Sequence, residues 1–159
     1  MKANRILVPL DGSTHGEAVL DKAVELADDG AALVLLRAAE ARSLVGHLVA
    51  AQLEVVHEAE QYLGGVAERL QRAGVTRVET CVWYGPAAEA IVEAARARDT
   101  DLILMSSHGR SGLSRLVLGS VAETVLRGTT TPILLIRPTG APVAAITAGG
   151  ARPAEVSRV

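Results

Sequence analysis

The segment 106–128, SSHGRSGLSRLVLGSVAETVLRG, holds the residues best suited to chemistry in this chain of 159 residues. Ser120-Val-Ala-Glu123 is a capping-box pattern, so a helix is predicted to begin at Ser120. The N–H groups and the dipole of a helix start favour an anion, and Gly119 lets a ligand approach the backbone closely. The segment therefore predicts a phosphate site. The alternative is that its glycines only form turns and that Ser120 only caps the helix.

The two standard nucleotide-binding motifs are absent from the sequence. The only lysines are Lys2 and Lys22, so there is no G-x-x-x-x-G-K-[ST] loop with a lysine for the β- and γ-phosphates. The turn after the first apolar run reads DGSTHG at 11–16, which is not the dinucleotide pattern G-x-G-x-x-G. A nucleotide site in this chain would therefore differ from both standard types.

Charged and titratable residues near this loop are few. His108 could orient a water molecule or donate to a phosphate, although a solvent-facing loop histidine is the preferred interpretation. Arg110 and Arg115 could neutralise phosphate charge, or could simply lie on a solvated face. Efficient phosphoryl transfer needs positioned positive charge and metal ligands. The sequence shows no such set, and we assign no catalytic residue and no metal-binding cluster.

Hydrophobic periodicity predicts the elements that carry the loop. Continuous apolar runs predict buried strands, and amphipathic segments between them predict helices. The strands are expected at 6–10, 32–38, 77–84, 101–105 and 132–136. The helices are expected at 15–28, 51–73, 86–98 and from 120 onward. The first of them has a capping box at Thr14-His-Gly-Glu17. The second is expected to face inward through Leu53, Val56, Leu63, Val66, Ala67 and Leu70.

This alternation of strands and helices predicts an α/β fold, a doubly wound parallel sheet with helices on both faces. Ligands of such sheets bind beyond the carboxyl ends of the strands, where the winding reverses. The turns after the first and the fourth strand, at 11–14 and 106–112, are therefore the candidate binding turns.

Composition excludes several classes of function. The hydrophobic content of 49% and the charged content of 21% are typical of one globular domain, predicted at 1–138. The segment 139–159 is rich in Pro, Gly and Ala and is predicted to be a flexible tail. A net charge of -2 and only three aromatic residues argue against nucleic-acid binding. No apolar run approaches the ~20 residues of a membrane helix. The single cysteine, Cys81, fits a cytoplasmic protein.

Three stretches in order resemble the universal stress protein family: ILVPLDGS, GPAAEAIVEAA and SSHGRSGLSRLVLGSVAETVLRGTTTPILLIRP. The resemblance covers about residues 3–138. It implies five parallel strands in the order 3-2-1-4-5 and a G-x-x-G, nine residues, G-[ST] motif for ATP. Here the motif is Ser106-Ser-His-Gly109, then Arg110–Leu118, then Gly119-Ser120. Ser106 replaces the first glycine, which either crowds the ribose or phosphate or adds a hydrogen bond.

The resemblance also implies a role for each matched position. Asp11 would bind the ribose or the adenine edge. Apart from the resemblance, Asp11 is the one acid well placed for Mg²⁺ if ATP binds with magnesium, although it lies nearer the expected sugar end of the site. Four apolar residues would border the base, and the loop and helix start would bind the phosphates. The residues concerned are Pro9, Leu10, Ala38 and Met105 at the base, and Gly109, Gly119, Ser120 and Val121 at the phosphates.

Three functions remain open from the sequence. The preferred one is an ATP-binding regulatory protein of the stress response with slow or no hydrolysis. The others are a slow ATPase, and a nucleotide-free member that acts as a dimeric interaction protein, for which Ser106 is the indication. The edge strand at 132–137 has no charge within Ile133–Ile136, so we expect a homodimer through it, as the resemblance also implies.

Overall fold

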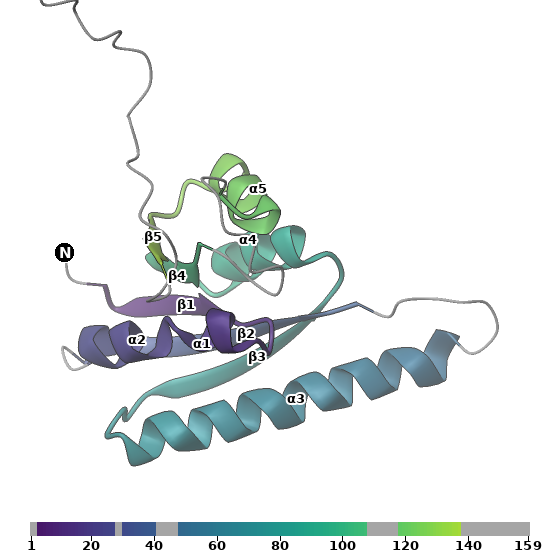
Figure 1. Ribbon diagram of the computed structural model, residues 1–159, viewed down its shortest axis with the longest axis horizontal. Helices are drawn as coiled ribbons and strands as arrows, with labels where there is room; N and C mark the ends of the chain where they lie inside the picture. The colour runs from purple at the N-terminus through teal and green to yellow at the C-terminus, as the bar shows by residue number, and fades with distance from the viewer. Residues whose placement is uncertain (1–2, 28–29, 41–47, 108–117, 138–159) are drawn as a thin grey trace, which may run out of the picture.

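The computed structural model describes residues 3–27, 30–40, 48–107 and 118–137 (Figure 1). Five strands form one sheet, and helices cover both of its faces. The strands are β1 (Arg5–Pro9), β2 (Ala32–Ala39), β3 (Val78–Tyr84), β4 (Leu102–Ser106) and β5 (Ile133–Ile136). The helices are α1 (Thr14–Glu17), α2 (Leu20–Ala27), α3 (Leu48–Arg72), α4 (Ala87–Ala97) and α5 (Ser120–Gly128).

All neighbouring strands pair in parallel, and the order is β3-β2-β1-β4-β5. Both the α/β class and the strand order expected from the sequence are thus confirmed. Near the carboxyl edge Pro9 pairs with Leu36, and Ser106 pairs with Ile136. This register brings the ends of β1, β2 and β4 to one edge, because parallel strands all end at the same side of a sheet.

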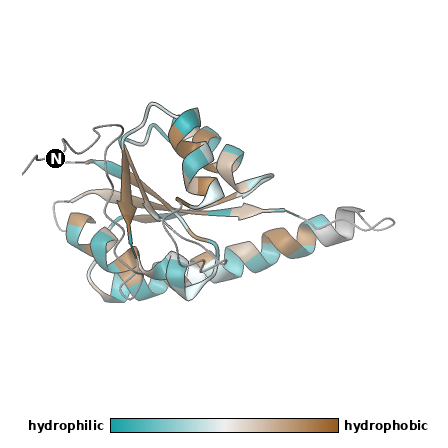
Figure 2. Cartoon of the chain, turned by 45° about the horizontal axis from the view of Figure 1, so that its top comes forward, coloured by the Kyte–Doolittle hydropathy of each residue, from teal (hydrophilic) through white to brown (hydrophobic). Residues whose placement is uncertain are grey.

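The sheet has a hydrophobic core on each face. Successive strand residues point to opposite faces, so a strand buried on both sides needs an unbroken apolar run. The core under α2 and α3 includes Ile6, Val8, Leu10, Leu33, Leu35, Leu63, Val66 and Leu70. The core under α4 and α5 includes Leu7, Val34, Leu36, Ile91, Ile103, Met105, Ala122 and Val125. Figure 2 shows the strands coloured as hydrophobic along most of their length.

The helix expected at 15–28 is two helices in the structure. Ser13, not Thr14, is the N-cap of α1, and its hydroxyl accepts a hydrogen bond of 2.9 Å from the Gly16 amide. Glu17 does not close a capping box, because its carboxylate contacts Tyr62 of α3 instead. Ala23 is fully buried in α2, and Leu20, Val24 and Ala27 are partly buried against the same core. The capping prediction was therefore wrong by one residue, and the helix is interrupted after Glu17.

Among the side chains of α3 whose burial is described, the buried ones begin at Ala59. Leu63, Val66 and Leu70 are buried as expected, and each buried side chain of this kind stabilises the fold by about 1.5–3 kcal/mol. Leu53 is 66% exposed, so its expected inward position was wrong. Figure 1 shows that the first turns of α3 lie beyond the end of β2, and there Gln52 donates a hydrogen bond of 3.1 Å to the hydroxyl of Tyr84, the last residue of β3. None of the described helices combines the length and apolarity needed to cross a membrane.

Candidate functional site

The turn after β1 and the end of β4 lie at the carboxyl edge of the sheet. The turn contains Asp11, and β4 is followed by Ser107. The Gly119 amide donates a hydrogen bond of 3.1 Å to the Ser107 carbonyl, so the start of α5 is fastened to the end of β4. The Ser107 amide donates in turn to the Ile136 carbonyl of β5 at 2.9 Å. Both turns expected to bind a ligand are therefore anchored at the same edge.

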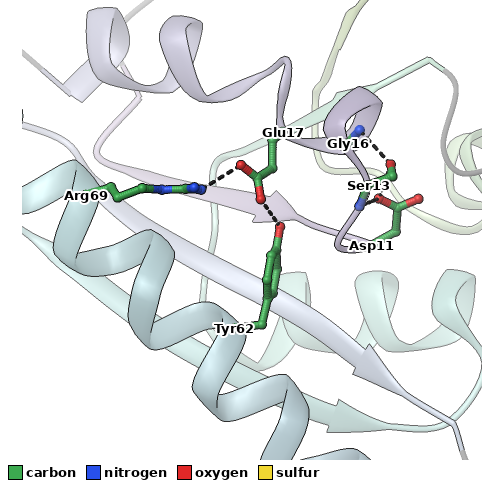
Figure 3. Close-up of polar contacts among 6 residues, drawn as sticks. All are labelled: Asp11, Ser13, Gly16, Glu17, Tyr62 and Arg69. Carbon is green, nitrogen blue, oxygen red and sulfur yellow. Dashed lines mark hydrogen bonds and ion pairs between the residues drawn. The ribbon is translucent and has the colours of Figure 1, made fainter.

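Asp11 is held in one orientation by its own turn (Figure 3). Its Oδ1 accepts hydrogen bonds from the Ser13 amide at 2.9 Å and from the Ser13 hydroxyl at 2.6 Å. Gly16 lies directly behind it, because a Cβ on Gly16 would stand 2.3 Å from Asp11 Oδ1. Only glycine leaves room for the carboxylate in this position. Asp11 is half-buried, so the site presents an oriented acceptor near the surface.

Helix α5 begins at Ser120, as predicted, but its N-cap differs from the sequence prediction. Gly119 is the N-cap, with φ -56 and ψ 144, and it makes no side-chain cap. Ser120 is the first helical residue, and Glu123 donates its amide to the Gly119 carbonyl at 2.9 Å while its carboxylate pairs with Arg127. The capping box at 120–123 is therefore wrong. The Gly119 amide was expected to serve a phosphate, and it is already engaged with Ser107.

Ser120 and Val121 occupy the first turn of α5, where amides have no acceptor within the helix. Both residues are exposed. The hydroxyl and the two amides lie at the positive end of the helix dipole, which favours an anion. This geometry agrees with the phosphate role expected for these two residues, without Gly119 as a donor.

The residues expected at the base lie on two different faces. Met105 belongs to the core under α4 and α5, and Ala38 follows Leu36 of that core by two residues, so both face α4 and α5. Pro9 shares this face, since it follows Leu7 of the same core by two residues. Leu10 is 4% exposed and packs in the opposite core. Leu10 and Met105, at 4% and 6% exposed, therefore have little surface to offer a base, whereas Pro9 and Ala38 are half-buried on the face of α4 and α5.

Four further expectations concern the loop after β4. Ser106 is described: it ends β4, is half-buried and pairs with Ile136. His108, Gly109 and Arg110 lie outside the described residues. Within the described ranges, no group of three His, Cys, Asp or Glu side chains could hold a metal ion.

A polar cluster beside the Asp11 turn was missed by the sequence analysis. The Tyr62 hydroxyl donates to Glu17 at 2.8 Å, and Arg69 donates to the other Glu17 oxygen at 2.6 Å (Figure 3). The Arg37 guanidinium carbon lies 5.0 Å from the centre of the Tyr62 ring. Burial and then the Glu17 carboxylate raise the pKa of Tyr62 well above its ordinary value. The one signal available in the sequence was an arginine inside the apolar strand run ALVLLRA.

Comparison with known proteins identifies relatives over nearly the whole described fold. A family model, the universal stress protein family, matches residues 2–137. Universal stress protein YxiE of Bacillus subtilis is 33% identical over 147 residues, 84% of this chain and 99% of that protein.

Two solved structures share the fold. A universal stress protein in complex with cAMP has a TM-score of 0.66 at 24% identity, covering 87% of this chain and 100% of that chain. An Arabidopsis thaliana protein of the same family with AMP bound has a TM-score of 0.63 at 14% identity, covering 86% and 93%.

Proposed function

The chain belongs to the universal stress protein family, and from this premise we propose that it is a regulatory protein of the stress response that binds ATP. In this proposal, occupancy of the site changes the shape or the partners of the protein. Asp11 binds the ribose, Pro9, Ala38 and Met105 border the adenine, and Ser120 and Val121 bind the phosphates. His108, Gly109 and Arg110 complete the phosphate side.

The observation that carries the proposal is the oriented Asp11 carboxylate at the same sheet edge as the start of α5. A carboxylate only accepts hydrogen bonds, and the vicinal ribose hydroxyls are donors, so the pair is complementary. The helix start supplies amides and dipole for an anion. Relatives with cAMP and with AMP bound support an adenine nucleotide as the ligand.

We propose slow or absent hydrolysis. The Asp11 carboxylate is the group best placed for Mg²⁺, but its Oδ1 already accepts two hydrogen bonds from Ser13. Phosphoryl transfer at ordinary enzyme rates needs positioned cations around the phosphates. The chain's only lysines, at positions 2 and 22, are both far in sequence from the loop after β4.

We also propose that the protein is cytoplasmic and forms a homodimer that pairs through β5. This strand is at the edge of the sheet, and its four residues are apolar and each partly exposed. An uncharged edge strand of this kind is a template for pairing with a second strand. A cytoplasmic location agrees with the single cysteine, Cys81, which is a buried free thiol.

The test is extraction of nucleotide from the purified protein, followed by calorimetry with ATP and Mg²⁺. ATP or another adenine nucleotide should be released, and the stripped protein should bind ATP. The proposal fails if no adenine nucleotide co-purifies and millimolar ATP gives no heat of binding. A turnover near the common enzyme value of roughly 10 s⁻¹ would instead identify an ATPase.

A further inference from the structure

Arg37 places a cation against the Asp11 turn. It is the sixth residue of β2, and its side chain leaves the sheet on the side of α1 and α3, like Leu33 and Leu35. A Cβ on Gly12 would stand 2.5 Å from one terminal guanidinium nitrogen of Arg37. The guanidinium therefore lies directly on the backbone of Gly12, the residue that follows Asp11.

The turn is enclosed on two sides. Arg37 contacts it at Gly12, whose φ of +78 suits glycine, and Gly16 supports it behind the Asp11 carboxylate. Between these contacts, Asp11 Oδ1 binds the amide and hydroxyl of Ser13. A displacement of the guanidinium removes one of the two supports that keep the carboxylate in its orientation.

The position of the guanidinium itself is set by α3. Its carbon lies 5.0 Å from the centre of the Tyr62 ring, within the range of a cation–π contact. The Tyr62 hydroxyl is bound to Glu17, and Arg69 binds the same carboxylate. The contact with Arg37 is made by the ring, which α3 carries against the guanidinium, and the hydroxyl contact to Glu17 is separate from it.

We propose that Arg37 is a positioning residue, which holds the Asp11–Ser13 turn in the orientation that Asp11 needs to bind the ribose of an adenine nucleotide. The inference rests on the proposed function for its ligand. It assigns to Arg37 a role in ribose recognition without contact to the ligand. A lysine cannot replace it, because an ammonium group lacks the plane that stacks on Tyr62 and covers Gly12.

The experiment compares ATP with 2′,3′-dideoxy-ATP in calorimetry on the full chain. The parent protein should prefer ATP by about tenfold or more, as expected for a hydrogen bond to a charged acceptor. Arg37→Gln and Arg37→Lys should each reduce this preference to about threefold or less. Tyr62→Phe is the matched control, since it keeps the ring under Arg37 and removes only the hydrogen bond to Glu17. This variant should prefer ATP over 2′,3′-dideoxy-ATP as strongly as the parent does.

A second measurement needs no nucleotide. The Ser13 amide is bound to Asp11, so its hydrogen exchange in the ligand-free protein reports the order of the turn. Exchange should be faster by about tenfold in Arg37→Gln and unchanged in Tyr62→Phe. If Arg37→Gln does not fold, Arg37→Lys carries both measurements, because it keeps the charge and most of the aliphatic stem.

The outcomes separate the two proposals. Faster Ser13 exchange together with a lost ribose preference supports the role of Arg37. A lost preference for ATP with unchanged Ser13 exchange overturns the positioning role, because Arg37 would then contact the ligand directly. An Arg37 variant that retains the parent's preference for ATP also overturns that role. If the parent binds no adenine nucleotide but Ser13 exchange still rises in Arg37→Gln, the proposed function fails and the positioning of the turn by Arg37 stands.

Discussion

Gly16→Ala moves the Asp11 carboxylate without removing it. The added Cβ would stand 2.3 Å from Asp11 Oδ1, 3.2 Å from Asp11 Cγ and 3.3 Å from the Ser13 hydroxyl. A carbon and an oxygen that are not bonded cannot approach so closely, so the carboxylate must swing away from Gly16. The hydrogen bonds of 2.9 and 2.6 Å from Ser13 then lengthen or break.

The effect on folding is small because two contributions oppose each other. Alanine stabilises a helix by about 1 kcal/mol relative to glycine, and Gly16 lies in α1 at an ordinary negative φ. Loss of the Ser13 hydrogen bonds costs about 1–2 kcal/mol, since water reaches the half-buried carboxylate. The free energy of unfolding should therefore change by no more than about 1 kcal/mol.

The effect on binding is large if Asp11 binds the ribose. A hydrogen bond to a charged group contributes about 1.5–3 kcal/mol, so a misplaced carboxylate should weaken ATP binding by roughly ten- to a hundredfold. Calorimetry with ATP measures this loss, and urea unfolding measures stability. Gly65→Ala in α3 is the matched control, because nothing lies within 4 Å of its Cβ position. It should gain up to about 1 kcal/mol of stability and keep the parent's affinity. A folded Gly16→Ala protein with the parent's affinity for ATP would refute the role of Asp11.

Three further changes test the phosphate side, the dimer and the polar cluster. Gly119 has φ -56 and ψ 144, which valine adopts without strain, so Gly119→Val should melt near the parent temperature. Its branched side chain would stand at the start of α5, where the phosphates approach the Ser120 and Val121 amides, so the variant should bind ATP at least about tenfold more weakly and adenosine almost unchanged. Equal losses for both ligands would place the phosphates elsewhere. Leu135→Lys introduces a charge into the edge strand β5 and should give folded monomers, which size-exclusion chromatography measures. An unaltered elution volume, or a parent protein that is already monomeric, counts against pairing through β5. Burial and the hydrogen bond to Glu17 raise the pKa of Tyr62. The stability from its protonated hydroxyl is therefore present at neutral pH and is lost as pH rises above the ordinary tyrosine pKa of about 10. In the native protein at about pH 11, Tyr62 should still be protonated and add no tyrosinate absorbance, so the parent and Tyr62→Phe should absorb equally. A clear drop in the variant contradicts the shift.

The sequence alone was sufficient for the layers of the fold. Strands buried on both faces need unbroken apolar runs, and ILVPL and the ALVLL part of ALVLLRA are such runs. The position of Asp11 directly after the first of them was enough to place it at the carboxyl edge. These inferences succeeded because each depends on a few neighbouring residues and on the alternation of side chains between the two faces of a strand. That alternation is a local property of the backbone.

The tertiary structure decided which residues support that carboxylate. Tyr62 and Glu17 are 45 positions apart, and Arg69 and Glu17 are 52 apart, so no local pattern links them. Leu53 continues the apolar period of α3 yet is exposed, since periodicity gives the direction of a side chain and not the extent of the sheet beneath it. The caps also depend on contacts beyond the local sequence pattern, because Ser13 caps α1 while it is bound to Asp11, and the Gly119 amide is bound to the Ser107 carbonyl. Asp11 could therefore be found from the sequence, but the Arg37 contact that holds its turn exists only after β2 and α3 have packed against each other.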